Sequence, residues 1–179
     1  MTHLSRPLPR FGLRPGWLTA GILAALVTLP AQALEGDASA PIEVVADRLE
    51  LDDRAGTAIY TGDVDIQQGS MQLTGERVEI QRNDAGEVSR ATATGDRAYI
   101  EQKPAPDEPV VRGWGRTIIY HAAERRVELI DQAELHQGHD TFDGGYVEYY
   151  LDRRTVQARA EVEGSERQRV RMTLNPEQQ

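Results

Sequence analysis

The chain contains no cysteine among its 179 residues. That absence excludes a disulfide framework, a thiolate zinc site, a cysteine nucleophile and a lipoprotein anchor that acylates a cysteine. The folded state must therefore be stabilised by a hydrophobic core without covalent cross-links.

Basic residues are also few. The sequence has 29 acidic and 20 basic side chains, a formal net charge of −9 and a single lysine, Lys103. Nucleic-acid binding needs clustered positive charge, so we expect no nucleic-acid partner. P-loop, G-x-G-x-x-G and G-x-S-x-G patterns are missing as well, so the sequence gives no enzyme signature and implies no cofactor.

The one long hydrophobic run lies near the N-terminus, at residues 18–29. It is too short to span a bilayer as a helix. Three arginines (Arg6, Arg10 and Arg14) precede it, and the small-x-small sequence Ala-Gln-Ala follows at 31–33. This order predicts a cleavable signal peptide over 1–33 and export of a single domain, 34–179, to the periplasm. An uncleaved N-terminal anchor is the alternative.

Beyond the leader, apolar and polar side chains alternate with period two, which is typical of strands with one buried face. Turn sequences such as Asn-Asp-Ala-Gly at 83–86 separate segments of about 4–7 residues. The pattern predicts an all-β domain of many short antiparallel strands and no helix of any length. Three prolines within 103–109 predict a surface loop there.

The alternating segments also repeat at a spacing of 69 residues. This shift places Val64 on Ala133 and Gly75 on Gly144 without a gap over about 30 positions. One departure is that Ile-Asp-Gln at 130–132 stands where the first copy has Thr-Gly-Asp at 61–63, so a turn glycine is missing. Two copies of one module predict units stacked along an axis.

These segments resemble the OstA-like family. The resemblance rests on PIEVVADRLELD at 41–52, YTGDVDIQQGSMQL at 60–73 and GERVEI at 75–80, with a second copy over 118–158 and RVRMTL at 169–174. It covers nearly all of the chain after the leader. Within the family, the match is to periplasmic proteins that bridge lipopolysaccharide transport between the two membranes. A cleavable leader sets the chain apart from the bitopic inner-membrane member, and its length sets it apart from the outer-membrane translocon.

The resemblance implies a twisted, partly open β-jellyroll whose apolar interior holds the acyl chains of lipopolysaccharide (lipid A). It also implies head-to-tail self-association through edge strands, and partners in a bitopic inner-membrane component and an outer-membrane translocon. Inward positions such as Ala91, Ala93 and Ala98 are small. We therefore expect an underfilled interior with room for hydrocarbon, although a tightly packed sandwich of small residues would show the same alternation.

Candidate lipid-contact residues follow from the same resemblance. The family's contact positions match Ile42, Val44, Ile100, Ile118, Tyr120 and Ala122. Alternation independently places Ile42 with Val44, and Ile118 with Tyr120, on common faces.

Arginine side chains near strand ends could also contact the phosphates of the head group. The candidates are Arg82, Arg97, Arg112 and Arg116, of which Arg82 is the preferred residue at the mouth of the interior. Of the two interpretations, we favour the one in which these arginines belong to solvated faces. Trp114 is the only tryptophan after the leader and offers a fluorescence reporter of lipid uptake.

Two other functional classes remain open at this point. Exposed first and last strands could serve a pure interaction module without lipid cargo. A carbohydrate-active enzyme would need converging carboxylates, for which Asp63 and Asp65 are candidates. His136 and His139 have a metal-like spacing, but Gly138 between them favours a solvated hairpin.

Overall fold

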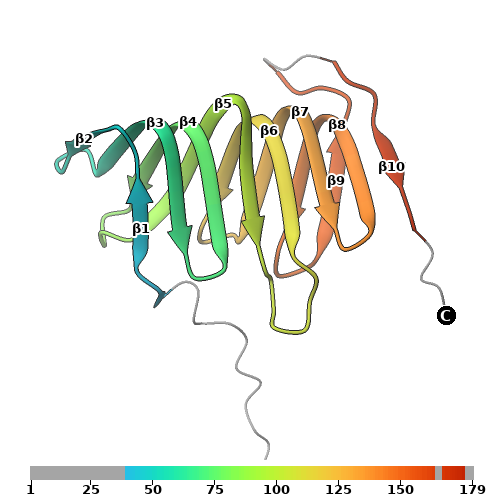
Figure 1. Cartoon of the computed structure of the whole chain (residues 1–179), viewed down its shortest axis with the longest axis horizontal. Helices are drawn as coiled ribbons and strands as arrows, with labels where there is room; N and C mark the ends of the chain where they lie inside the picture. The colour runs from blue at the N-terminus through green and yellow to red at the C-terminus, as the bar shows by residue number, and fades with distance from the viewer. Residues whose placement is uncertain (1–38, 164–166, 176–179) are drawn as a thin grey trace, which may run out of the picture. The chain divides into compact units, whose positions relative to one another are not determined.

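The structure, a computed structural model, describes residues 39–163 and 167–175. The predicted signal peptide over 1–33 lies outside the described residues. Ten strands are present (Figure 1): β1 (Ile42–Val45), β2 (Arg48–Asp52), β3 (Thr57–Gln68), β4 (Met71–Arg82), β5 (Val88–Gln102), β6 (Val111–His121), β7 (Arg126–Gln137), β8 (Asp140–Tyr150), β9 (Thr155–Arg159) and β10 (Arg171–Thr173). The part of the chain that the structure describes has no helix with the length and apolar character needed to cross a bilayer.

All ten strands belong to one antiparallel sheet. Strands β3 to β8 pair in chain order as a meander, while β1 and β2 both pair with β3 at one edge. At the other edge β9 and β10 both pair with β8. The all-β class is thereby confirmed, as are edge positions for the first and last strands. The proline-rich segment forms the β5–β6 connection, as expected.

Strand length is where the sequence prediction is wrong. The six central strands have 11–15 residues instead of 4–7. Each of them joins two alternating segments through an irregularity in the ladder, such as that between Thr61 and Val64. A β-bulge breaks the alternation without ending the strand, so the sequence pattern resembles two strands.

The bulges of neighbouring strands lie side by side, and the sheet bends there. Figure 1 shows the result as a front and a back layer that meet along the upper border. The front layer contains β1, β10 and the segments 64–68, 71–74, 98–102, 111–114, 133–137 and 140–144. The back layer contains β2, β9 and the other halves of β3 to β8.

The 69-residue repeat corresponds to two units of the same design. The hairpin of β3 and β4 matches that of β7 and β8, and β6 matches β1 and β2 joined into one strand. Gly62 has φ of +86° in the first unit, and its counterpart Asp131 has φ of +59° in the second. The bulge therefore keeps its left-handed backbone where the glycine is missing, and Asp is among the residues that adopt this conformation most readily.

The core lies between the two layers, where their inner faces meet. Its buried side chains form one cluster that draws on both layers, including Ile66, Leu73 and Leu135 from the front and Ile118 and Val147 from the back. At Gly113 this central region is packed and not underfilled, because the missing side chain leaves room for Leu129 of the other layer. A side chain at Gly113 would lie 3.0 Å from both terminal methyl carbons of Leu129.

Candidate functional site

Apolar side chains cross the inner face of the sheet in unbroken rows from one edge to the other. Alternation within each strand and pairing between strands place these residues in register. One row of the back layer is Leu49, Tyr60, Val78, Ala93, Ile118, Leu129, Val147 and Ala158. One row of the front layer is Val44, Ile66, Leu73, Ile100, Gly113, Leu135, Phe142 and Met172.

Exposed apolar side chains lie at both edges of the sheet. Leu51 on β2 is 56% exposed and Met172 on β10 is 50% exposed, and Ile42, Leu49, Val170 and Leu174 are exposed as well. Edge strands also present unpaired backbone groups that can accept a further strand. Each edge therefore offers an apolar inner face together with a hydrogen-bonding edge.

The predicted lipid-contact residues lie at different depths along these rows. Ile42 and Val44 are on β1, with Val44 paired to the buried Ile66. Ile100 and Ile118 are fully enclosed. Tyr120 is half-buried and belongs to the row that ends at Leu51.

The remaining candidates lie off the rows. Ala122 follows the end of β6, where its backbone N–H donates to the Ser89 carbonyl at 3.1 Å. Arg82 ends β4, and its guanidinium contacts the Asp53 carboxylate at 2.8 Å. Sequence reasoning did not select Leu49 and Leu51, although both continue the inner rows and are more exposed than Ile42. Their alternation was visible, but their exposure follows from the edge position of β2.

A small cavity lies between the two layers of β5 to β8. It has a volume of about 10 Å³ and is lined by Ile100, Gln102, Val111 and Leu135 of the front layer and Val127, Tyr149 and Leu151 of the back layer. Gln102 is 7% exposed, and its side-chain oxygen has no hydrogen-bond donor among the described residues. It is thus a polar atom in an otherwise apolar lining.

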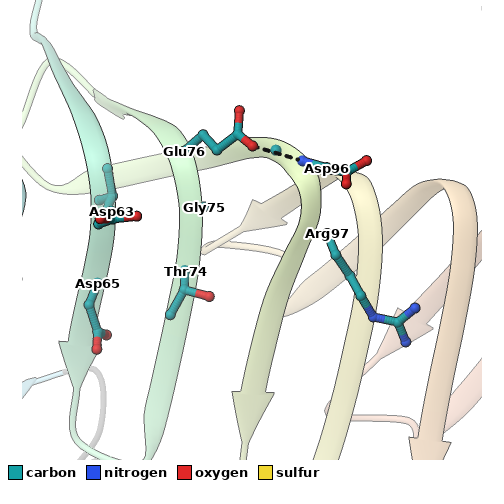
Figure 2. A pocket seen from close by; sticks show the side chains of 9 residues that line it. Asp63, Asp65, Thr74, Gly75, Glu76, Asp96 and Arg97 are labelled. Carbon is teal, nitrogen blue, oxygen red and sulfur yellow. Dashed lines mark hydrogen bonds between the residues drawn. The ribbon is translucent and has the colours of Figure 1, made fainter.

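The outer face of the bend carries a cleft with acidic walls. Its volume is about 360 Å³, and Figure 2 shows Asp63, Glu76 and Asp96 around it with Arg97 at one side. These three carboxylates are exposed. A glycosidase acid is instead held in a less polar environment beside a second carboxyl group. The cleft therefore supports neither this chemistry nor phosphate binding.

Three of the four proposed head-group arginines contact carboxylates of the protein itself. Arg97 contacts Glu134 at 2.7 Å, and Arg112 contacts Glu101 at 2.7 Å. Hydrogen bonding to Tyr99, opposed by burial and assisted by Arg112, lowers the pKa of Glu101. These pairs favour the interpretation of solvated outer faces over phosphate contact.

Trp114 lies on the same outer face, so it does not report directly on the interior. It packs against Tyr99 with ring centroids 5.3 Å apart and against His136 at 4.8 Å. His136 in turn contacts Glu134 at 2.7 Å. Among residues 39–163 and 167–175, no group of three or more His, Asp or Glu residues is placed to hold a metal ion.

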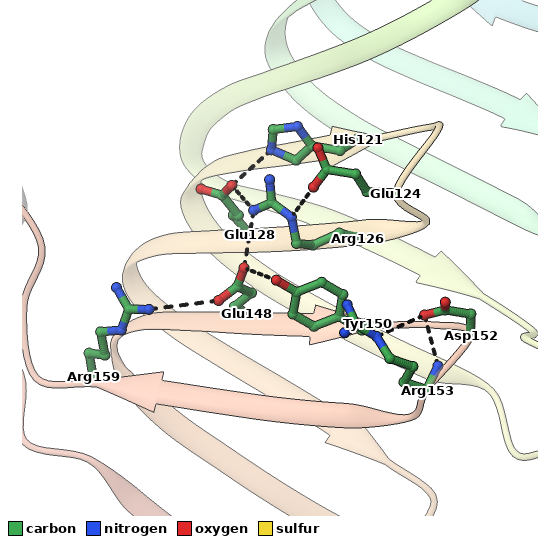
Figure 3. A network of polar contacts seen from close by, with 9 residues as sticks. All are labelled: His121, Glu124, Arg126, Glu128, Glu148, Tyr150, Asp152, Arg153 and Arg159. Carbon is green, nitrogen blue, oxygen red and sulfur yellow. Dashed lines mark hydrogen bonds and ion pairs between the residues drawn. The ribbon is translucent and has the colours of Figure 1, made fainter.

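A second charged network covers the outer face of the back layer (Figure 3). Arg126 lies at its centre and contacts Glu124 at 2.7 Å, Glu128, and Glu148 at 3.2 Å. Burial alone would lower the pKa of Arg126, but the hydrogen bonds to Glu124 and Glu128 outweigh this effect and raise the pKa above its ordinary value. Because these side chains come from β7, β8 and the turn before β7, the network links neighbouring strands and has a structural role.

Comparison with known proteins identifies the fold's relatives. Residues 43–155 match the family model described as "LptA/(LptD N-terminal domain) LPS transport protein". The chain belongs to this family. It is 42% identical to the lipopolysaccharide export system protein LptH of Pseudomonas aeruginosa over 163 residues, which cover 89% of this chain and 93% of LptH.

A second relative and a solved structure agree with this assignment. Escherichia coli K12 LptA is 28% identical over 143 residues, covering 79% of this chain and 75% of LptA. The crystal structure of P. aeruginosa LptH, described as the periplasmic LptA homologue, superposes with a TM-score of 0.72 and covers 78% of this chain and 99% of that one.

Proposed function

We propose that this protein is a lipopolysaccharide-export component that shields acyl chains inside its bent sheet and bridges transport between the two membranes. The observation that carries the proposal is the set of apolar rows that cross the inner face from one edge of the sheet to the other, together with the exposed apolar side chains at both edges. Burial of hydrocarbon contributes about 0.8 kcal/mol per methylene group. A few buried methylene groups on each acyl chain therefore contribute several kcal/mol to the free energy of lipid binding.

The bridge would form by head-to-tail association, with the β1/β2 edge of one molecule against the β9/β10 edge of the next. Leu51 and Met172 would then lose their exposure, and the inner rows of successive molecules would become continuous. The same edges would receive the bitopic inner-membrane partner and the outer-membrane translocon. Export to the periplasm would follow from the leader at 1–33.

Neighbouring valines on β1 provide a matched test of the interior. Val44 pairs with the buried Ile66, whereas Val45 is 71% exposed and pairs with Asp65. We expect Val44→Asp to lose co-elution with lipopolysaccharide, because it places an unpaired carboxylate among apolar side chains. Val45→Asp should retain it. Circular dichroism of both purified proteins controls for folding, and a folded Val44→Asp protein with unchanged lipid binding would contradict the proposal.

The packed central interior favours a second candidate, an assembly module that uses the same edges without lipid cargo. In that case the wild-type protein would self-associate through its edges, and lipopolysaccharide would not co-elute with it at any protein concentration.

A further inference from the structure

The free ends of the two layers face each other along the lower border of the sheet in Figure 1, which we call the seam. The front layer contributes the turns at 69–70 and 138–139 and the β5–β6 loop at 103–110. The back layer contributes the turns at 53–56, 83–87, 122–125 and 151–154. Any acyl chain that enters the interior from the side must pass between these two sets of turns.

Two contacts cross the seam near its C-terminal end. Arg154 Nη1 of the back layer lies 3.1 Å from Glu108 Oε1 of the front layer. The side-chain amide of Gln137 donates to the Tyr149 hydroxyl at 3.3 Å. Burial, followed by the charge of Glu108, raises the pKa of Tyr149 to about 12, so its hydroxyl stays protonated at neutral pH. We call these two contacts the clasp.

The first repeat unit lacks the side chains that form this clasp. The 69-residue shift places Ile80 at the position of Tyr149 and Ala85 at the position of Arg154. Neither side chain can make the corresponding polar contact. The counterpart of Gln137, Gln68, donates instead to the Ala40 carbonyl at 3.2 Å. The clasp therefore distinguishes the C-terminal half of the seam from the N-terminal half.

The interior behind the clasp is closed to hydrocarbon. Its cavity of about 10 Å³ is at or below the roughly 10–15 Å³ that a single water molecule occupies. Closure also leaves the Gln102 oxygen buried without a donor from the part of the chain that the structure describes, which destabilises the closed arrangement. The Arg154 and Glu108 side chains are partly exposed, and exposed ion pairs are weak. The polar contacts of the clasp can thus be broken at little cost in free energy.

We propose that the clasp of Glu108–Arg154 and Gln137–Tyr149 is a gate that must open before acyl chains can occupy the C-terminal half of the interior. Its opening brings Gln102 within reach of a lipid hydroxyl or amide N–H, which donates to the oxygen left unpaired in the closed state. This inference rests on the proposed function, since it concerns the entry of the same lipid.

Cross-linking across the seam tests the gate. The chain has no native cysteine, so E108C/R154C introduces the only thiols. A short reversible bis-thiosulfonate linker should hold the seam closed. We expect lipopolysaccharide affinity to fall about tenfold or more, which corresponds to the loss of about two buried methylenes. Reduction of the linker should restore binding.

The control pair D65C/Q72C lies within one layer. Asp65 and Gln72 are on neighbouring strands of the outer front face, with side chains 3.0 Å apart, and their cross-link should leave lipid affinity unchanged. Spin labels at the same two pairs provide a second measurement. The 108–154 distance should lengthen when lipopolysaccharide is added, and the 65–72 distance should not.

The possible outcomes separate the gate from the proposed function. Equal lipid binding by linked and reduced E108C/R154C, or a 108–154 distance that lipid does not change, overturns the gate and leaves the transport proposal intact. Failure of the wild-type chain to bind lipopolysaccharide overturns the transport proposal and the gate with it.

Discussion

Close contact between the layers at Gly113 and Leu129 makes a prediction about stability. A methyl group at Gly113 would lie 3.0 Å from both terminal carbons of Leu129 and 3.1 Å from Ile100 Cγ2. These distances are shorter than ordinary van der Waals contact, and Leu129 is fully buried, so it cannot move into solvent. We expect Gly113→Ala to lower the free energy of unfolding by about 1–3 kcal/mol, the usual cost of overpacking.

The reciprocal change creates space at the same point. Leu129→Ala alone should cost about 3–5 kcal/mol, because it removes a fully buried leucine and leaves a cavity. In the double variant the new methyl group enters that cavity. Gly113→Ala should then cost less than about 0.5 kcal/mol in the Leu129→Ala background, which gives a favourable coupling of about 1 kcal/mol or more.

Urea unfolding followed by circular dichroism measures all four proteins of this cycle. A second cycle that combines Gly113→Ala with Ile66→Ala is the control, since Ile66 is equally buried but lies on β3, three strands from β6. That pair should be additive. If the Gly113/Leu129 pair is also additive within about 0.5 kcal/mol, the two layers are not in contact there and the packed interior described above is wrong.

Two further predictions concern the outer face and the bulge. The pKa of Glu101 is lowered in the folded protein, so its contribution to stability is present above its ordinary pKa of 4.5 and lost as pH falls through the lower folded value. Wild type and Glu101→Gln should therefore differ in melting temperature at pH 7 and converge toward pH 3; a constant difference would contradict this assignment. Gly62→Ala should lower the free energy of unfolding by about 2 kcal/mol, because φ is +86° and the new Cβ would lie 2.8 Å from Asp47 Cβ. Gly86 also has positive φ but has open space around it. Gly86→Ala, measured by the same urea unfolding, should therefore lower the free energy of unfolding by less. The difference between the two variants separates the cost of the steric clash from the cost of the backbone conformation.

The fold was predictable to the extent that it depends on alternation. Val44, Ile66 and Leu73 face the interior because each lies at one of the alternate apolar positions of its strand. An alternation with period two is enough to identify these positions in the sequence. The 69-residue shift likewise aligned the two repeat units correctly, because the matching strands have nearly the same length and the turns between them have the same length.

The bend could not be found in the same way. It depends on bulges, and these are made by different residues in the two units, Gly62 in one and Asp131 in the other. Because the bend determines which segments face each other, contacts such as that between Gly113 and Leu129 could not be predicted from the sequence either. Small inward residues therefore suggested a hollow interior, whereas at Gly113 the space is occupied by Leu129 of the opposite layer.

The candidate site was predictable only in part for a related reason. Ile42 and Val44 could be placed on the inner face from alternation and resemblance, but the exposure of Leu49 and Leu51 depends on β2 being an edge strand. The role of an arginine depends on its partner in three dimensions. Arg82 appeared available for a phosphate in the sequence, and the structure places it 2.8 Å from Asp53.

The charge distribution decides which force can draw an anionic lipid to this protein. The chain carries a net charge of −9, and the arginines considered for head-group contact are mostly paired with its own carboxylates. Long-range electrostatics is therefore repulsive, and affinity must come from burial of acyl chains along the inner rows.

This conclusion predicts an unusual salt dependence. Binding through arginine–phosphate contacts would weaken as salt screens them, whereas screening of the repulsion between two anions strengthens association. We expect lipopolysaccharide affinity to stay constant or rise between about 50 and 500 mM NaCl, a range over which the screening length falls about threefold. Arg82→Gln should bind as wild type does throughout. A steep loss of affinity with salt, reduced in the Arg82→Gln protein, would show instead that head-group contact provides the binding free energy and that the apolar rows are secondary.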